Sequence, residues 1–77
     1  MTFAANYLTV FVLFPRENGA RWRVVLPGGA MASFRRESEA MAHAFEAARA
    51  MKNRGRPVKV LRQNRAGTWI EFPQPVM

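Results

Sequence analysis

The sequence predicts an α+β fold: a two-layer β-β-α-β-β sandwich, with a four-stranded, mainly antiparallel sheet and one helix on one sheet face. Three observations carry this prediction. Near the N-terminus, β-branched and aromatic residues flank Asn18-Gly19, a strong hairpin signal. Residues 36–53 repeat apolar side chains with the period of a helix. A second pair of strand-like segments then closes the chain.

The first predicted hairpin joins residues 7–14 to residues 20–26. The first of these segments, YLTVFVLF, is rich in residues that favour strands. Asn18 and Gly19 both tolerate the positive φ that a tight hairpin turn requires. The second segment, ARWRVVL, alternates polar and apolar side chains over most of its length. Residues 27–29, Pro-Gly-Gly, are expected to end this strand.

Residues 36–53 are expected to form the helix that covers the sheet. Their apolar side chains recur every three to four residues, so they share one face of a helix. Gly55 follows as a typical stop, because glycine accepts the left-handed conformation that ends many helices. The predicted apolar stripe consists of Ala40, Met41, Ala44, Phe45, Ala48 and Met51.

The second predicted hairpin joins residues 58–63 to residues 68–72. Both segments are rich in β-branched or aromatic residues, and residues 64–67, Asn-Arg-Ala-Gly, form a typical turn between them. One helix covers only one face of the resulting sheet. The contents of the opposite face therefore become the main evidence about function.

The length of the chain predicts one domain over residues 1–77. The ordered core is expected at about residues 6–72, with a loose tail at residues 73–77. The apolar stretch at residues 8–14 has no basic residue before it, and it is shorter than the ~20 residues that span a bilayer. We therefore expect a cytoplasmic protein without a membrane segment.

A series of core and turn positions between residues 21 and 71 carries a resemblance. They are Trp22-Arg23-Val24, Phe34, Glu39-Ala40, Ala44, Ala47-Ala48, Gly55, Val58-Lys59-Val60 and Gly67-Thr68-Trp69-Ile70-Glu71. This pattern resembles a family of small, uncharacterised bacterial and phage domains built as hairpin, helix and hairpin. The resemblance implies that fold and no activity. Arg36 stands where the family has a helix-capping threonine, so Ser33 or Ser38 is the expected cap.

The inventory of reactive side chains argues against catalysis and metal binding. The chain has no cysteine, no aspartate and one histidine, His43. Metal sites and acid–base pairs need clusters of such residues, whereas His43 is expected alone on the outer face of the helix between Glu39 and Glu46. We therefore expect no enzymatic activity, no cofactor and no small-molecule substrate.

The first strand segment is apolar on both faces, whereas a half-exposed strand alternates apolar with polar residues. Either neighbouring aromatic residues of the same chain cover its second face or another chain does, because an exposed apolar strand aggregates. A chain of 77 residues without cysteine gains no stability from disulfides. We therefore expect a homodimer, with an interface that includes Tyr7, Thr9, Phe11, Leu13 and Trp69.

Twelve Lys and Arg residues against five acidic residues give a net charge of +7. Such a surplus attracts phosphate polymers, although a solvated arginine-rich surface is the alternative explanation. A protein–protein interaction or assembly domain is the alternative function, since Trp and Arg are common contact residues. The predicted binding residues for DNA or RNA lie on the open sheet face and in the loops: Arg21, Arg23, Arg54, Arg56, Lys59, Arg62 and Arg65.

Overall fold

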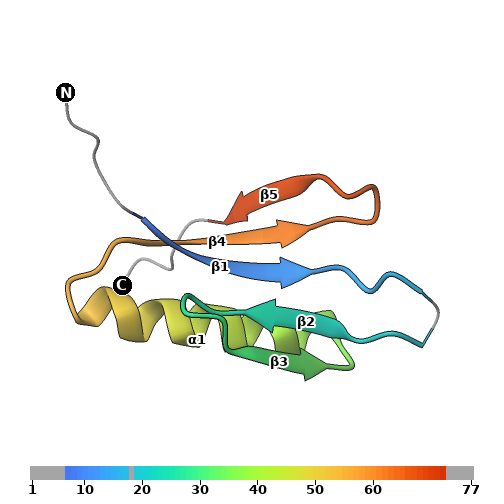
Figure 1. Cartoon of the computed structure of the whole chain (residues 1–77), viewed down its shortest axis with the longest axis horizontal. Coiled ribbons are helices and arrows are strands. Elements are labelled where there is room, and N and C mark those ends of the chain that lie inside the picture. Colours follow the sequence, from blue (N-terminus) through green and yellow to red (C-terminus); the bar gives the residue numbers. More distant parts are fainter. Residues whose placement is uncertain (1–6, 18, 73–77) are drawn as a thin grey trace.

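A mixed five-stranded sheet with one helix packed on one face makes up the described part of the chain (Figure 1). The computed structural model describes residues 7–17 and 19–72. In chain order the elements are β1 (Leu8–Leu13), β2 (Trp22–Val25), β3 (Met31–Phe34), α1 (Glu37–Asn53), β4 (Val58–Gln63) and β5 (Trp69–Phe72). Across the sheet, the strand order is β3-β2-β1-β4-β5.

The prediction of four strands is wrong because it missed β3. Residues 27–29 do end β2, but they also turn the chain back, and the Leu26 amide donates to the Ala30 carbonyl at 2.8 Å. Gly28 and Gly29 supply φ angles of +97° and +101° in this turn, which glycine adopts without strain. The sequence MASF has a weak strand pattern because β3 lies at the sheet edge, where small and polar residues are tolerated.

The pairing of β1 with β4 at the centre of the sheet is parallel, a feature that a hairpin–helix–hairpin reading did not predict. The other pairings, β1–β2, β2–β3 and β4–β5, are antiparallel. The chain leaves β3 at the end where β1 also ends, and α1 carries it back before β4 begins (Figure 1). Helical crossovers of this kind connect parallel strands, so the missed strand accounts for the missed parallel pair.

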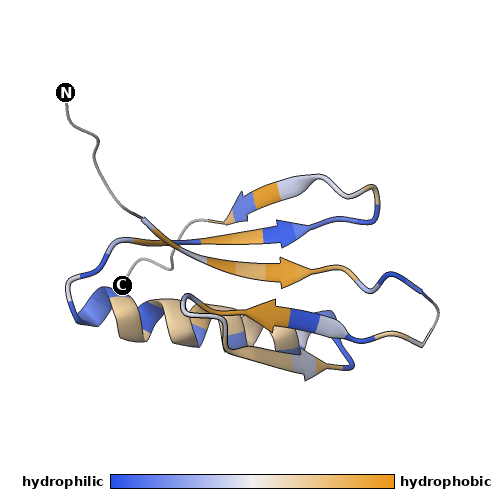
Figure 2. Ribbon diagram, in the orientation of Figure 1, coloured by the Kyte–Doolittle hydropathy of each residue, from blue (hydrophilic) through white to orange (hydrophobic). Residues whose placement is uncertain are grey.

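The core forms where small residues of α1 pack against branched residues of the sheet. Alanine at the contact lets a helix approach a sheet closely, and valine fills the space between them. Figure 2 shows hydrophobic residues along β1 and in part of β4, at the centre of the sheet. The predicted helical stripe is confirmed, since its alanines are buried and its longer side chains pack around the core. The fully buried residues are Val10, Val12, Val24, Val60, Ala40, Ala44 and Ala48.

The N-terminus of α1 has no side-chain cap. Arg36 precedes the helix with extended φ and ψ of −117° and 146°, and it makes no capping hydrogen bond with its side chain. Ser33 lies in β3 and Ser38 lies within the helix, so neither of the expected serines caps it. Glu37 and Glu39 instead place negative charge in the first turn, which stabilises a helix N-terminus electrostatically.

The predicted helix stop at Gly55 is confirmed. Gly55 has a φ of +85°. Its amide donates to the Lys52 carbonyl at 2.9 Å, and the Arg56 amide donates to the Met51 carbonyl at 3.2 Å. This pair of hydrogen bonds is the Schellman pattern, which satisfies carbonyl groups of the last helical turn. It also sets the direction in which the chain leaves α1 for β4.

The other predicted bounds differ from the structure by one or two residues. The segments predicted at residues 7–14 and 20–26 are shorter, as β1 and β2, and β5 begins at Trp69. The prediction for β4, residues 58–63, is confirmed. Asn18 of the first predicted turn and the predicted tail at residues 73–77 lie outside the described residues.

Candidate functional site

The sheet face opposite α1 is the candidate binding surface, because no other element of the described chain packs against it. Residues that pair directly across neighbouring strands point to the same face. Phe11 pairs with Val25 on one side and with Leu61 on the other. We define the open face as the residues that share this orientation: Thr9, Phe11, Leu13, Arg23, Val25, Met31, Ser33, Lys59, Leu61, Gln63, Trp69 and Glu71.

Aromatic rings lie at two places, one on the open face and one at its edge, where Tyr7 precedes β1. The rings of Phe11 and Trp69 meet edge to face, with centroids 5.4 Å apart and an interplanar angle of 68°. Beside them, the Nζ of Lys59 lies 5.0 Å from the centroid of the Tyr7 ring. Trp69 is 40% exposed and Tyr7 is 56% exposed. The face thus presents two accessible aromatic surfaces, one of them next to a cation.

Apolar side chains cross the middle of the open face in a row. Cross-strand pairing places Met31, Val25, Phe11 and Leu61 side by side from β3 to β4. Met31 is 59% exposed, and the other three are half-buried. Glu71 of β5 pairs with Leu61 and ends the row with a charge, while Arg23 and Lys59 lie two residues away along their strands. An apolar centre with a polar rim is the usual anatomy of a protein contact surface.

The structure brings some of the predicted nucleic-acid-binding cations together and separates others. Arg23 and Lys59 lie on the open face, as the alternation along their strands indicates. Arg54 and Arg56 are exposed in the loop between α1 and β4. Arg65 lies in the β4–β5 turn at the opposite end of the molecule (Figure 1). The predicted cations therefore do not form one continuous patch.

Arg62 lies on the helix side of the sheet rather than on the open face. Its Nη1 donates to Glu37 Oε2 at 2.7 Å, and its guanidinium carbon lies 5.6 Å from the centroid of the Phe72 ring. Its side chain is only 19% exposed. Arg62 shares the alternation of Val58 and Val60, so the sequence contained the signal that places it beside α1. Its position fits a structural role.

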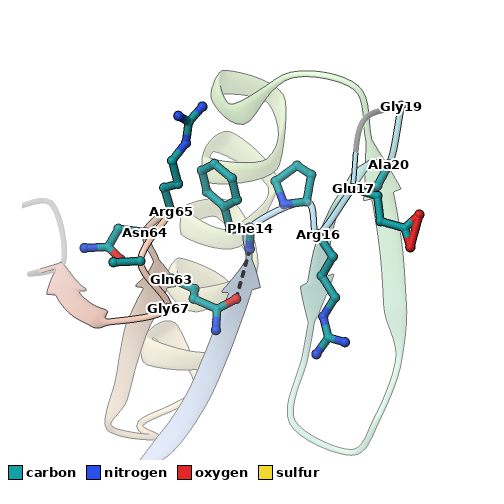
Figure 3. A pocket seen from close by; sticks show the side chains of 11 residues that line it. Phe14, Arg16, Glu17, Gly19, Ala20, Gln63, Asn64, Arg65 and Gly67 are labelled. Carbon is teal, nitrogen blue, oxygen red and sulfur yellow. Dashed lines mark hydrogen bonds between the residues drawn. The ribbon is translucent and has the colours of Figure 1, made fainter.

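A hollow of about 760 Å³ opens where the central parallel strands end. We call it the carboxyl-end hollow, since β1 and β4 both finish there and their following loops form its walls. Figure 3 shows Phe14 between Arg16 and Arg65, whose side chains extend in different directions. The lining residues are Phe14, Pro15, Arg16, Glu17, Gly19, Ala20, Gln63, Asn64, Arg65, Ala66 and Gly67.

A second hollow adjoins the first on the side of β2 and β3, and the two share the loop residues Arg16, Glu17, Gly19 and Ala20. Arg21, Arg23 and Ser33 complete its lining. Arg23 and Ser33 are also part of the open face, so the two hollows connect that face to the end of the sheet. Arg16 was not among the predicted binding residues. Its position opposite the β4–β5 turn follows from the pairing of β1 with β4, which the sequence did not predict.

Within the described residues, no three His, Cys, Asp or Glu side chains lie close enough together to hold a metal ion. His43 is half-buried and its ring packs against Phe34 of β3, with centroids 5.1 Å apart. The expectation of a purely outer position for His43 is therefore wrong. The reason is again β3, which adds an apolar neighbour beside α1.

Comparison with protein-family models, with curated proteins and with solved structures found no match to this chain. In the part of the chain that the structure describes, α1 is too short and too polar to cross a membrane.

Proposed function

We propose that this chain is a small, non-enzymatic binding module for single-stranded nucleic acid, and that it binds through the open face. The observation that carries the proposal is a pair of accessible aromatic surfaces: Trp69 against Phe11, and Tyr7 next to the cation of Lys59. Proteins that bind single strands without sequence preference combine such rings with a positively charged surface. Here both features lie on the face that α1 leaves uncovered.

Base stacking supplies the short-range part of the proposed interaction. Trp69 lies on the edge strand β5, and its 40% exposure leaves ring surface for a base. Phe11 is half-buried and holds the indole in place by its edge contact. A stacked base contributes roughly 1–3 kcal/mol by alanine substitution. Tyr7 offers a second ring for stacking. The ammonium group of Lys59 beside it can pair with a phosphate of the bound strand.

Cations supply the long-range part. All twelve Lys and Arg residues lie within the described chain, and in that part the ion pair is Arg62 with Glu37. Among the described residues, no other cation has a carboxylate oxygen within 4.0 Å, so these cations attract a polyanion from solution. If four phosphates are contacted, log K should fall with log salt at a slope of about −3 for a single strand.

Tryptophan fluorescence tests this proposal directly. Trp69 is exposed while Trp22 is 9% exposed in the core, so quenching by an oligothymidylate should come from Trp69. We expect Trp69→Ala and Arg23→Gln each to weaken binding roughly tenfold, measured by anisotropy of a labelled strand. Arg49→Gln, on the outer face of α1, removes the same charge as Arg23→Gln and should change binding about twofold. Equal effects of these two arginine variants would contradict the proposal.

A second use of the same face is favoured by the apolar row from Met31 to Leu61. We propose that, without nucleic acid, the open face pairs two copies of the chain. Five strands at about 4.8 Å and four paired residues at about 3.3 Å give roughly 320 Å² of flat face. This is small beside the ~800 Å² per partner of a stable interface. The dimer should therefore be weak and should compete with nucleic acid for the face.

A further inference from the structure

We propose that the carboxyl-end hollow is a binding site for a multiply charged phosphate group. The ligand class is an oligophosphate, either free or as phosphates of a strand that continues from the open face. The second of these sources rests on the proposed function, whereas the site itself does not. The site includes Arg16 and the side-chain amides of Gln63 and Asn64, which the charge pattern of the sequence did not single out.

The position of the hollow follows from the topology. β1 and β4 run parallel side by side, so both strands deliver their following loops to the same end of the sheet. In open sheets with parallel strands, ligands bind outside the carboxyl ends of the strands. The β1–β2 loop and the β4–β5 turn form facing walls here, and Phe14 lies between them (Figure 3).

Two amide side chains offer donors at the β4 wall. The Phe14 amide donates to Gln63 Oε1 at 3.4 Å, and the Thr68 amide donates to Asn64 Oδ1 at 2.9 Å. These bonds occupy the oxygen end of each side chain and leave the NH₂ groups as donors. Within the described residues, no group accepts a hydrogen bond from either amide nitrogen. Phosphate oxygens are acceptors for both side chains, and the two amide nitrogens point in different directions (Figure 3), so separate phosphate groups of an oligophosphate would bind them.

Arginines flank these donors from both loops. Arg16 and Arg65 are exposed, and the described chain provides neither with an ion-pair partner. Glu17 also lines the hollow, but Figure 3 places its carboxylate on the far side of Arg16 from Gln63 and Asn64. Exposed guanidinium groups can reorient toward an anion, and each charge-assisted hydrogen bond to phosphate is about twice as strong as a neutral one.

The second hollow links this site to the open face. It shares Arg16 with the carboxyl-end hollow and adds Arg21 and Arg23. Arg23 lies on the open face beside Leu13, with which it pairs. A strand stacked on Trp69 and Phe11 thus has a continuous basic route over the end of the sheet. Arg16, Arg21 and Arg23 line the second hollow, and Arg16 and the two amide donors line the carboxyl-end hollow.

Inorganic tripolyphosphate, without nucleic acid, is the first probe. In about 50 mM salt, where surface charges are weakly screened, we expect amide NMR shifts to concentrate in residues 14–20 and 63–68. Arg16→Gln combined with Arg65→Gln should weaken affinity at least tenfold. Arg49→Gln combined with Lys52→Gln, on the outer face of α1, removes the same charge and should weaken it about threefold or less. Equal losses, or shifts centred on residues 54–56, would overturn the site.

Two single substitutions separate a built site from diffuse attraction. Glu17→Gln should raise tripolyphosphate affinity about threefold, and Glu46→Gln on α1, with the same change in charge, should raise it less. Asn64→Asp keeps an oxygen for the Thr68 amide but replaces the NH₂ donor by negative charge, so binding should be lost while the turn persists. Retained binding in Asn64→Asp, or equal effects of the two glutamate variants, would count against the site.

An oligonucleotide arm separates this inference from the proposed function. If tripolyphosphate binds at the hollow but an oligothymidylate does not bind the chain, the proposed function fails and the phosphate site stands. The opposite outcome is that the oligothymidylate binds through Trp69, while the double variant of Arg16 and Arg65 binds both the strand and tripolyphosphate as well as the double variant of Arg49 and Lys52 does. In that case the phosphate site fails and the proposed function stands. When both hold, the double variant should also reduce the salt slope for the strand by about 1.4 for two lost phosphate contacts.

Discussion

Arg62 was predicted to bind nucleic acid, but the structure places it in contacts within the fold. In the sequence, Arg62 lies close to Arg65, and both were predicted to bind nucleic acid because of their charge. In the fold it joins β4 to the start of α1 through Glu37 and lies over the Phe72 ring. Its aliphatic stem is covered as well, since the side chain is 19% exposed. Packing and charge together make Arg62 part of the scaffold.

The pair of Arg62 and Glu37 yields a prediction about stability. Arg62→Ala should lower the free energy of unfolding by about 1–2 kcal/mol, because it removes an ion pair, a cation–π contact and stem packing. Arg65→Ala, in the exposed turn, should change it by less than about 0.5 kcal/mol. Urea denaturation measures both.

A double-mutant cycle with Glu37→Gln isolates the ion pair itself. The coupling energy between Arg62 and Glu37 should be about 0.5–1 kcal/mol, since Glu37 is 46% exposed and solvent screens the pair. Zero coupling, together with a loss of oligonucleotide binding in Arg62→Ala, would mean that Arg62 acts on the ligand and not on the scaffold.

At the scale of elements, the contact between α1 and the sheet depends on small side chains. Ala44 is fully buried against the valines of β1, β2 and β4. Ala42, two residues earlier on the same helix, is exposed. The two alanines have the same propensity for a helix, so they separate packing from local structure.

Leucine at each of these positions tests the packing. Ala44→Leu should destabilise the fold by about 1–3 kcal/mol, because the added methylene groups force α1 away from the sheet. Ala42→Leu should change stability by less than about 0.5 kcal/mol, because its side chain meets solvent. Thermal or urea unfolding compares the variants. If Ala44→Leu destabilises the fold as little as Ala42→Leu does, the core tolerates a wider gap between helix and sheet.

Among the elements, β3 was the largest omission and had the widest consequences. Its four residues carry little strand signal of their own. Pairing with β2 makes them a strand, by backbone hydrogen bonds that any sequence can form. Adding β3 also reverses the direction in which the chain enters α1. The parallel pairing of β1 with β4 and the facing loops of the hollow follow from that reversal. The half-buried position of His43 follows from its contact with Phe34 of β3.

At the scale of the whole molecule, the question is what occupies the open face. The apolar row suits a second copy, whereas the rings and cations suit a nucleic-acid strand. A weak dimer that dissociates when a strand binds accommodates both, because the two partners compete for one surface. A net charge of +7 on each copy adds repulsion between them, and this repulsion decreases as salt screens it.

Sedimentation velocity over about 5–500 µM tests this competition. We expect the average mass to rise with protein concentration, to rise further with salt, and to fall to that of a monomer–strand complex when oligothymidylate is added. Met31→Glu should abolish the rise, because Met31 is 59% exposed at the end of the apolar row. Ala42→Glu, on the helix, is the matched control and should not. A monomer at every concentration would remove the self-association proposal.

Local patterns account for much of what could be predicted. The helical stripe, the stop at Gly55, the extent of β4 and the two-faced alternation of strands depend on neighbours in sequence, and these predictions are confirmed. The same alternation also indicated that Arg23, Lys59 and Phe11 share a face. Even the helix-side position of Arg62 follows from its spacing to Val58 and Val60, although the prediction grouped it with the loop cations.

What the sequence determined by itself is the α+β class, the helix with its buried alanines, and a basic chain with an apolar first strand. Periodicity and turn chemistry are local, so they can be read without knowing which segments pair. Only the tertiary structure decided that β3 exists, that β1 and β4 are parallel, and that Arg16 and Arg65 line one hollow. These features depend on backbone pairing between distant segments, and backbone hydrogen bonds carry no record of side-chain identity.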